Sequence, residues 1–378
     1  MSGLFNSLNS SVMALTAHSR ALETSGKNLA NVNNPAYARQ RVIYGDRGTI
    51  ATPDGAESLG MEALGVEQLR DALLDRQVMR ELALSAAFTA EQGGYQRAQA
   101  ALGQSIDRAS SSSTADAGGI AAALDEFFNA FQSFAIRSTD AGERQSLLQK
   151  ASILTDRVRL TDQRLAQVQT DLDAQITNGV SDLNRLVNTI ADLNRQIGRF
   201  EVNAAGSAVD LRDQRQARFE ELAAKLPVEI QDLAGGQVRI VAKEANGADV
   251  VLVDGTQVPG SVSFDGAQLT GGDPATALAP ASGFFKGSLD ARDGAIATLR
   301  SDLDLLTRQL ATSVNAAYNP TGATGDFFLF TGMTAGTVAL HAGLTVASLK
   351  ASDGGAAGDN SVALAIGRLG SQTFSTAA

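Results

Sequence analysis

Leucine recurs at every seventh position near the start of the chain, which predicts an amphipathic helix over residues 1–30. The neighbouring seam positions, Ser11, His18 and Ser25, are small or polar, whereas a two-stranded coiled coil would place apolar residues there. The pattern favours a helix packed on its leucine edge, with an ordinary amphipathic helix of a globular domain as the alternative. We expect the leucine stripe to expose an apolar face and the helix to be poorly anchored within this chain. The stripe consists of Leu8, Leu15, Leu22 and Leu29.

Asparagines and a proline predict the end of this helix between Asn31 and Pro35, because proline disfavours the helical region for the residue before it. Residues 39–44 have an extended pattern, and residues 45–60, rich in Gly, Pro and Asp, predict a loop or hinge. Helical spacing returns over residues 62–108, with Gly93-Gly94 as the expected weak point.

The longest helical pattern runs from residue 140 to residue 200, with apolar residues at intervals of three and four and a weak point at Asn178-Gly179. A helix of this length would span roughly 90 Å, which is typical of coiled coils and filament subunits rather than of globular enzymes. Before it, phenylalanines between residues 124 and 134 predict a short helix with a buried face. After it, residues 209–226 predict a helix that ends at Pro227.

Between residues 227 and 285 the apolar residues form short β-type runs separated by glycine-containing turns. Asn246-Gly247 lies between two such runs and is a strong hairpin signal. Helical spacing resumes over residues 289–317, and Phe327–Phe330 predicts a short buried strand or anchor. No helix is expected after Ser361.

These patterns predict a mainly α fold with an inserted β domain, of the α+β class. Its body would be a long antiparallel helical bundle or coiled coil, and its β domain would be small and antiparallel. We divide the chain into residues 1–44, an N-terminal helix and turn, residues 45–226, a long-helix body, and residues 227–285, the β domain. Residues 286–378 return to the helical body and include a loop or strand segment at 318–360.

Composition narrows the possible functions. The chain has 31 Lys and Arg against 41 Asp and Glu, a net charge of −10, and no basic run, so we expect no nucleic-acid partner. Cysteine is absent and the two histidines, His18 and His341, are far apart in sequence, which disfavours thiol nucleophiles, histidine triads and zinc sites. We find no apolar run long enough to span a membrane and no secretory signal at the N-terminus.

Two groups of charged residues are the candidates for acid–base chemistry, one at Asp210, Arg212 and Asp213 and one at Asp290, Arg292 and Asp293. Their spacing is that of ordinary helix-surface ion pairs, and this is the interpretation we favour. We recognise no phosphate-binding loop, dinucleotide fingerprint or nucleophile elbow. The sequence therefore predicts a protein that is not an enzyme and has no catalytic, cofactor-binding or metal-binding residues.

One motif is more specific than any of these patterns. Residues 28–40, NLANVNNPAYARQ, resemble the signature that follows the N-terminal helix in bacterial flagellar rod and hook axial proteins. Asn34 stands where that family usually has Thr, and Ala36 stands where it usually has Gly. The resemblance implies that the motif contributes to contacts between subunits, through Asn28, Ala30, Asn31, Pro35, Tyr37, Arg39 and Gln40.

Two later segments resemble the hook-associated protein 1 branch of that family, which forms the junction between hook and filament. The first is the Asp-Leu-x-Asp-Gln-Arg stretch made of Asp210, Leu211, Asp213, Gln214 and Arg215. The second is Gly358, Asp359, Asn360 and Ser361. The Arg39-Gln40 ending of the first motif points to the same branch.

The resemblance implies a structural subunit that works by self-assembly into a ring, between the hook protein and a second hook-associated protein. It also implies an export chaperone for the full-length protein and export through the flagellar type III apparatus, without a cleaved signal, to the extracellular flagellum. The family ends in a helix that pairs with the N-terminal one in an inner tube domain, so we expect this chain to be a truncated form. The alternatives are a hook-associated protein 3-like or rod/hook subunit and, less well supported, an exported wall-remodelling hydrolase.

Overall fold

A computed structural model describes residues 2–34, 36–52, 55–103, 119–322, 325–329, 332–354 and 358–372. The chain divides into two compact units, unit 1 (1–89 and 175–287) and unit 2 (90–174 and 288–378). Long helices and small antiparallel sheets make up these units, so the predicted mainly α fold with a β domain is confirmed. The four-part division made from the sequence stays a prediction.

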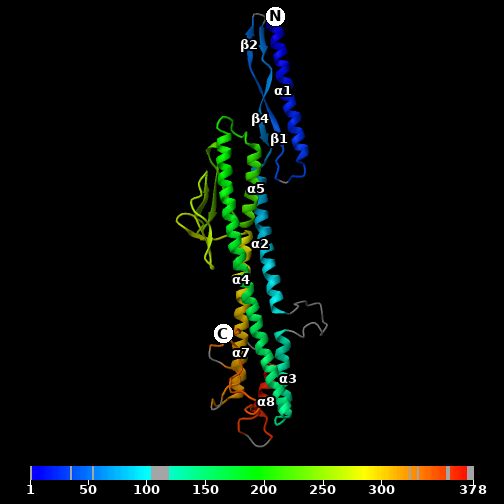
Figure 1. Ribbon diagram of the computed structural model, residues 1–378, viewed down its shortest axis with the longest axis vertical. Coiled ribbons are helices and arrows are strands. Elements are labelled where there is room, and N and C mark those ends of the chain that lie inside the picture. The colour runs from blue at the N-terminus through cyan, green and yellow to red at the C-terminus, as the bar shows by residue number, and fades with distance from the viewer. Residues whose placement is uncertain are drawn as a thin grey trace. The chain divides into compact units, whose positions relative to one another are not determined.

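Unit 1 begins with α1 (Ser2–Ala30), which packs against an antiparallel pair of strands, β1 (Gln40–Asp46) and β4 (Met61–Gln68) (Figure 1). A second antiparallel pair, β2 (Thr49–Thr52) and β3 (Gly55–Ser58), follows β1 and leads back to β4, and we call residues 40–68 the ribbon. The loop predicted over residues 45–60 is therefore wrong, and so is the helix predicted to begin at residue 62. Residues 61–68 include good helix formers, but pairing with β1 and packing on α1 override that local propensity.

The face that α1 turns toward the strands is not its leucine edge. Ala17 and Thr24, from a row of small residues, are buried, whereas the four leucines of the stripe are 60–75% exposed. Small side chains let the helix approach the sheet closely, and the stripe then points away from it. The exposed apolar face is confirmed. The helix nevertheless has a partner within the chain, which it contacts through its small residues. Packing on the leucine edge stays a prediction.

Two long helices continue through the glycines at which a break was expected. α2 (Ala72–Leu102) begins after Asp71, whose carboxylate accepts the Leu73 and Leu74 amides at 2.8 and 3.3 Å as an N-cap. It remains helical through Gly93 and Gly94, and α4 (Ala141–Phe200) remains helical through Asn178 and Gly179. Within unit 1, Gly179 faces the rings of Phe284 and Phe285, so close packing accounts for this glycine better than a break does.

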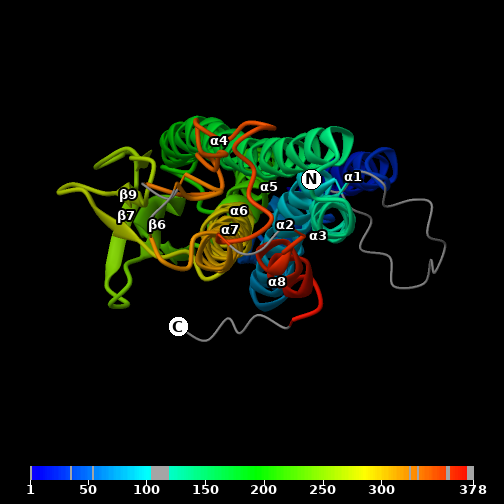
Figure 2. The same ribbon diagram turned by 90° about the horizontal axis from the view of Figure 1, so that it is seen from below.

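The β domain lies beside α4 in unit 1 and contains two three-stranded antiparallel sheets (Figure 2). The first has the order β5 (Glu229–Asp232), β6 (Val238–Lys243) and β7 (Asp249–Asp254), and the predicted turn at Asn246-Gly247 joins β6 to β7. The second contains β8 (Ser263–Phe264), β9 (Leu269–Gly271) and β10 (Thr276–Leu278). α5 (Val209–Lys225) precedes these strands, and α6 (Gly283–Leu289) follows them.

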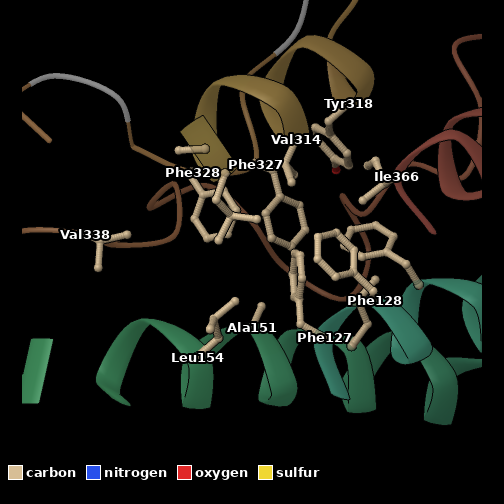
Figure 3. Packing of buried hydrophobic residues seen from close by; sticks show 14 of the residues in the cluster. Phe127, Phe128, Ala151, Leu154, Val314, Tyr318, Phe327, Phe328, Val338 and Ile366 are labelled. Atoms are coloured by element: carbon tan, nitrogen blue, oxygen red, sulfur yellow. The ribbon is translucent and has the colours of Figure 1, made fainter. Parts of the chain in front are cut away.

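Unit 2 contains α3 (Ile120–Ile136), the first part of α4, α7 (Ala297–Tyr318) and α8 (Ser361–Leu369). A π-helical segment, Asp290–Ile296, leads from α6 into α7. The core of unit 2 is an aromatic cluster from α3, α7 and the segment after α7 (Figure 3). Its fully buried rings are Phe127, Phe131, Phe134, Tyr318, Phe327 and Phe328.

The predicted anchor at residues 327–330 is confirmed for its described part, because the backbone of Phe327 and Phe328 is held by the buried Asn315. Phe330 lies outside the described residues. The absence of a helix after Ser361 is a wrong prediction, since α8 packs on α3 and α7 through Val362, Ala363 and Ile366. Nine residues of mixed small and apolar character gave too short a pattern to be recognised.

Candidate functional site

The motif of residues 28–40 folds around the side chain of Asn28, in the last turn of α1. Its amide nitrogen donates to the Gln40 carbonyl at 2.8 Å, and its oxygen accepts the Gln40 amide at 2.9 Å. The same oxygen accepts the Tyr37 hydroxyl at 3.0 Å. Asn28 therefore pairs with the backbone of Gln40 as a neighbouring strand would, and fixes where β1 begins.

Between these two residues, asparagines build the turn itself. The Asn31 carbonyl accepts the Asn34 amide at 2.9 Å, and the Asn31 side chain donates back to the Lys27 carbonyl at 3.0 Å. Asn34 accepts the Ala36 amide at 3.2 Å through its side-chain oxygen. This contact is an Asx-type turn, which threonine, the usual family residue, forms more weakly. Pro35 lies outside the described residues.

Tyr37 is half-buried and has its hydroxyl bonded to Asn28 within the same chain. Burial, together with the nearby carboxylates of Asp210 and Asp213, raises the pKa of the Tyr37 hydroxyl. The hydroxyl is therefore a neutral hydrogen-bond donor over the ordinary pH range. Its role in contacts between subunits stays a prediction, and within this chain the residue contributes to the turn.

The Asp-Leu-x-Asp-Gln-Arg stretch forms the first turns of α5 and meets the motif directly. Both carboxylate oxygens of Asp213 accept the Ala38 amide at 3.2 Å, and Asp210 accepts the Gln40 side-chain amide at 3.2 Å. Arg70 donates to Asp213 at 2.9 Å. The structure thus brings together two segments that the sequence had marked independently.

Burial raises the pKa of the Asp213 carboxyl, although Arg70 and the Ala38 amide act in the opposite direction. The Asp213 side chain is buried. Most of its attraction to the Arg70 guanidinium therefore only offsets the free energy that it costs to remove both charged groups from water. We therefore regard Asp213 as a positioning group for the turn rather than as a large source of stability.

The two arginines of this stretch bind the end of α4 and the connection between β5 and β6. Arg212 makes a two-pronged ion pair with Glu201, at 2.7 Å for each contact. Burial acts to raise the pKa of Glu201, but Arg212 and two backbone amides outweigh it and hold that pKa below its usual value. Arg215, also buried, donates to the Asn194 side-chain oxygen at 2.8 Å and to the Gly236 carbonyl at 2.7 Å.

Other predicted site residues lie at the surface around the contact between the turn of residues 28–40 and α5, which we call the junction. Arg39 is exposed, and no ion pair is recorded for it among the described residues, whereas Arg41 pairs with Glu67 of β4. Ala30 is exposed at the end of α1. Gln214 is exposed and lines a groove of about 260 Å³ that also includes Asn34 and Tyr37.

Gly358, Asp359, Asn360 and Ser361 lie in unit 2 and start α8. Asp359 accepts the Ser361 amide at 3.0 Å, and the Asn360 side chain donates to the Ala135 carbonyl at the end of α3 at 2.6 Å. Gly358 has a positive φ of 93°, which favours glycine there. This segment therefore positions α8 against α3.

Comparison with known proteins identifies the family. The family model described as "Flagellar hook-associated protein FlgK helical domain" matches residues 83–328, which is more than half of the chain. The chain belongs to the FlgK family. This match contains the Asp210–Arg215 stretch but neither the turn at residues 28–40 nor the segment at residues 358–361.

Individual relatives agree with this assignment. Flagellar hook-associated protein 1 of Escherichia coli K12 is 29% identical over 245 residues, covering 65% of this chain and 42% of that protein. The Bacillus subtilis 168 protein of the same name is 25% identical over 377 residues, covering 88% of this chain and 71% of that protein. The chain thus spans less than half the length of its enterobacterial relative.

A solved structure shares the fold. The flagellar hook junction protein FlgK from Burkholderia pseudomallei matches 68% of this chain and 46% of its own, with a TM-score of 0.54 and 20% identity. At that identity the likeness shows the fold alone.

Several residues of the junction were missed from the sequence. Arg70, Asn194 and Glu201 each bind a residue of the Asp-Leu-x-Asp-Gln-Arg stretch, yet each looks like an ordinary polar position of a strand end or helix. An asparagine on the otherwise apolar side of α4 was the one available signal in this FlgK-family chain.

The chemistry of the junction is that of hydrogen bonding and ion pairing. Asp210, Asp213 and Glu201 are each bonded to a neighbouring donor. In the part of the chain that the structure describes, no group of three or more His, Asp or Glu side chains is placed to hold a metal ion. No described helix is both long enough and apolar enough to cross a membrane.

Replacing Asn28 with alanine is expected to destabilise unit 1 by about 1–2 kcal/mol, because three hydrogen bonds of the turn lose their partner. Urea denaturation followed by circular dichroism would measure the change. Asn33→Ala is the matched control, since Asn33 is exposed in the same turn, and it should change stability by less than about 0.5 kcal/mol. Equal effects of the two substitutions would contradict the role given to Asn28.

Proposed function

We propose that this chain is part of a structural subunit of the bacterial flagellum, a hook-associated junction protein that joins hook to filament by self-assembly. The family match over residues 83–328 is the observation that carries the proposal. The names of the relatives, flagellar hook-associated protein 1, support it. We propose that the subunit acts without catalysis, since the carboxylates of the junction serve as hydrogen-bond acceptors for the fold.

The proposed partners follow from that role. They are further copies of the same chain in a ring, the hook protein, a second hook-associated protein and an export chaperone for the full-length protein. The proposed location is the extracellular flagellum, reached through the flagellar type III apparatus. The exposed stripe of α1 and the exposed Arg39 are the surfaces of this chain that we assign to subunit contacts.

Loss of the gene is expected to leave cells with hooks but without filaments, and to release unpolymerised filament protein into the medium. Electron microscopy of the cells and immunoblotting of the medium would measure both effects, and the wild-type gene should reverse them. Normal filaments in the deletion strain would refute the proposal. Defects that begin at the rod or in the hook itself would favour a rod or hook subunit instead.

Arg39→Glu in the full-length protein is expected to weaken incorporation at the hook tip while leaving unfolding unchanged within about 0.5 kcal/mol, because the side chain is exposed. The readout is filament protein shed into the medium, compared with melting of the purified variant. Arg159→Glu is the matched control, since among the described residues the one ion-pair partner of Arg159 is Asp156, one turn away on α4. If Arg39→Glu cells keep normal filaments, this residue lies outside the subunit contacts.

A further inference from the structure

α1, the turn after it and the ribbon form a small module, residues 2–69, whose parts hold one another. α1 packs on β1 and β4, and Asn28 binds the backbone of Gln40 at the start of β1. In the described part of the chain, α5 is the element outside this module that has more than marginal contact with it. The module is therefore well connected within itself and joined to the rest of unit 1 chiefly at the junction.

The junction is made of polar groups. The module residues that are buried there are Ala38 and Gln40, and no large apolar side chain of the described module is buried beside them. The Ala38 amide donates to Asp213, and the Gln40 side chain donates to Asp210. Water can replace such partners, and parting the two surfaces would expose little apolar area. The hydrophobic effect therefore does little to hold the junction together.

Both sides of the junction are fixed by bonds of their own. On the α5 side, Arg212 is bonded to Glu201 and Arg215 to Asn194, so the start of α5 is fixed to α4. On the module side, the hydrogen bonds of Asn28 fix the turn to α1 and β1. A polar contact between two firmly built bodies is a place where one can move against the other while both stay folded.

Arg70 lies where the chain passes from β4 into α2. Its guanidinium donates to the Ala36 carbonyl of the turn at 3.4 Å, to Asp75 of α2 at 3.3 Å and to Asp213 of α5 at 2.9 Å. Among the described residues, Arg70 is the cation that is paired with the buried Asp213. One side chain thus connects the module, α2 and α5, and it belongs to the segment that would turn if these parts moved.

We propose that residues 69–71 are a hinge on which the module of α1 and the ribbon swings as one body, and that Arg70 holds this hinge closed. Hinges are short segments at the ends of regular elements that absorb a change of backbone angles, and this segment lies between β4 and α2. Loss of Arg70 would leave the buried Asp213 carboxylate without its cation, which favours parting of the junction. The swing redirects the leucine stripe while α1 stays folded.

The chain has no cysteine, so pairs of spin labels on introduced cysteines can be used to measure distances by pulsed electron paramagnetic resonance. Leu15→Cys with Asn188→Cys reports across the hinge, because Leu15 is exposed on α1 and Asn188 is exposed on α4. Leu15→Cys with Thr49→Cys reports within the module, because Thr49 is exposed on β2. The two pairs distinguish a swing of the module from its unfolding.

Arg70→Glu places a second carboxylate beside the buried Asp213, so most molecules should open and the distance across the hinge should change. The distance within the module should stay as it is in the unsubstituted chain. Arg70→Lys keeps the positive charge, so it should remain mostly closed. Arg76→Glu is the matched control and should change neither distance, because Arg76 is exposed on α2 and has no recorded ion pair in the described part of the chain.

The proposal is overturned if Arg70→Glu leaves the distance across the hinge unchanged, or if Arg76→Glu changes that distance equally. It is also overturned if the distance within the module broadens together with the distance across the hinge, since the module would then unfold instead of swinging. These measurements are made on the purified chain, so their outcome is independent of the role proposed for it in the flagellum.

Discussion

Gly287→Ala is expected to lower the free energy of unfolding of unit 1 by about 3 kcal/mol, among the largest losses for a single methyl group in this chain. A Cβ atom at Gly287 would lie 2.0 Å from the Ala87 carbonyl oxygen and 2.8 Å from its carbon. Both are backbone atoms of α2, so no side chain can turn aside. α6 and α2 would have to separate along their contact, and the buried side chains around them would lose packing.

The control for this substitution is Gly294→Ala in the π-helical segment that follows. No atom lies within 4 Å of a Cβ built there. Alanine has the higher helix propensity, so this variant should be neutral or more stable by up to about 1 kcal/mol. Urea denaturation of both variants, followed by circular dichroism at 222 nm, would measure the difference. A loss below about 1 kcal/mol for Gly287→Ala would show that the two helices are less tightly packed than described.

Asn194→Ala is expected to cost about 3–4 kcal/mol, because a fully buried side chain there satisfies three other groups. Its amide nitrogen donates to the Val238 carbonyl at 3.0 Å and to the Gly255 carbonyl at 2.7 Å, at the edge of the β5–β7 sheet. Its oxygen accepts Arg215. Alanine would take the side-chain donor away from the buried Gly255 carbonyl, leave the Val238 carbonyl to the Gly255 amide at 3.2 Å, and remove one of the two acceptors of a buried cation.

Asn188→Ala is the matched control on the same helix. Asn188 is exposed, and in the described part of the chain its side chain bonds to the Asn184 carbonyl one turn away, so its loss should change stability by less than about 0.5 kcal/mol. Thermal and urea unfolding of the two variants would give the comparison. Similar stabilities would mean that Asn194 does not connect α4 to the sheet as described.

The regular parts of this fold could be predicted from the sequence because their signals are repeated many times. α4 has sixty residues of one periodicity, and the β6–β7 hairpin has Asn-Gly between apolar runs. The extended pattern of residues 39–44 correctly predicted most of β1. The later strands of this region could not be predicted, since they contain glycines and good helix formers and depend on pairing with a neighbouring strand. The N-cap at Asp71, where α2 begins, was missed from the sequence.

The candidate site was predictable only in part, for a related reason. Both motifs, residues 28–40 and the Asp-Leu-x-Asp-Gln-Arg stretch, could be recognised in the sequence. The contact between them could not be predicted. Arg70 and Asp213 are separated by 143 positions, and the residues around each of them give no indication that the two are in contact. Packing of α5 against the turn creates the contact, and a periodic pattern carries no information about such a pairing.

The two sides of α1 respond to different requirements. Residues such as Ala17 and Thr24 are held to small sizes by the strands beneath them, so changes there should be detected by any assay of folding. The leucines of the stripe contribute little to the folded chain, so a library of folded variants should accept many residue types at Leu15 and Leu22. A second library, selected for motile cells, should be compared with it. If the motile cells tolerate far fewer residue types at Leu15 and Leu22, the difference between the two libraries will measure how strongly binding constrains the exposed side of α1.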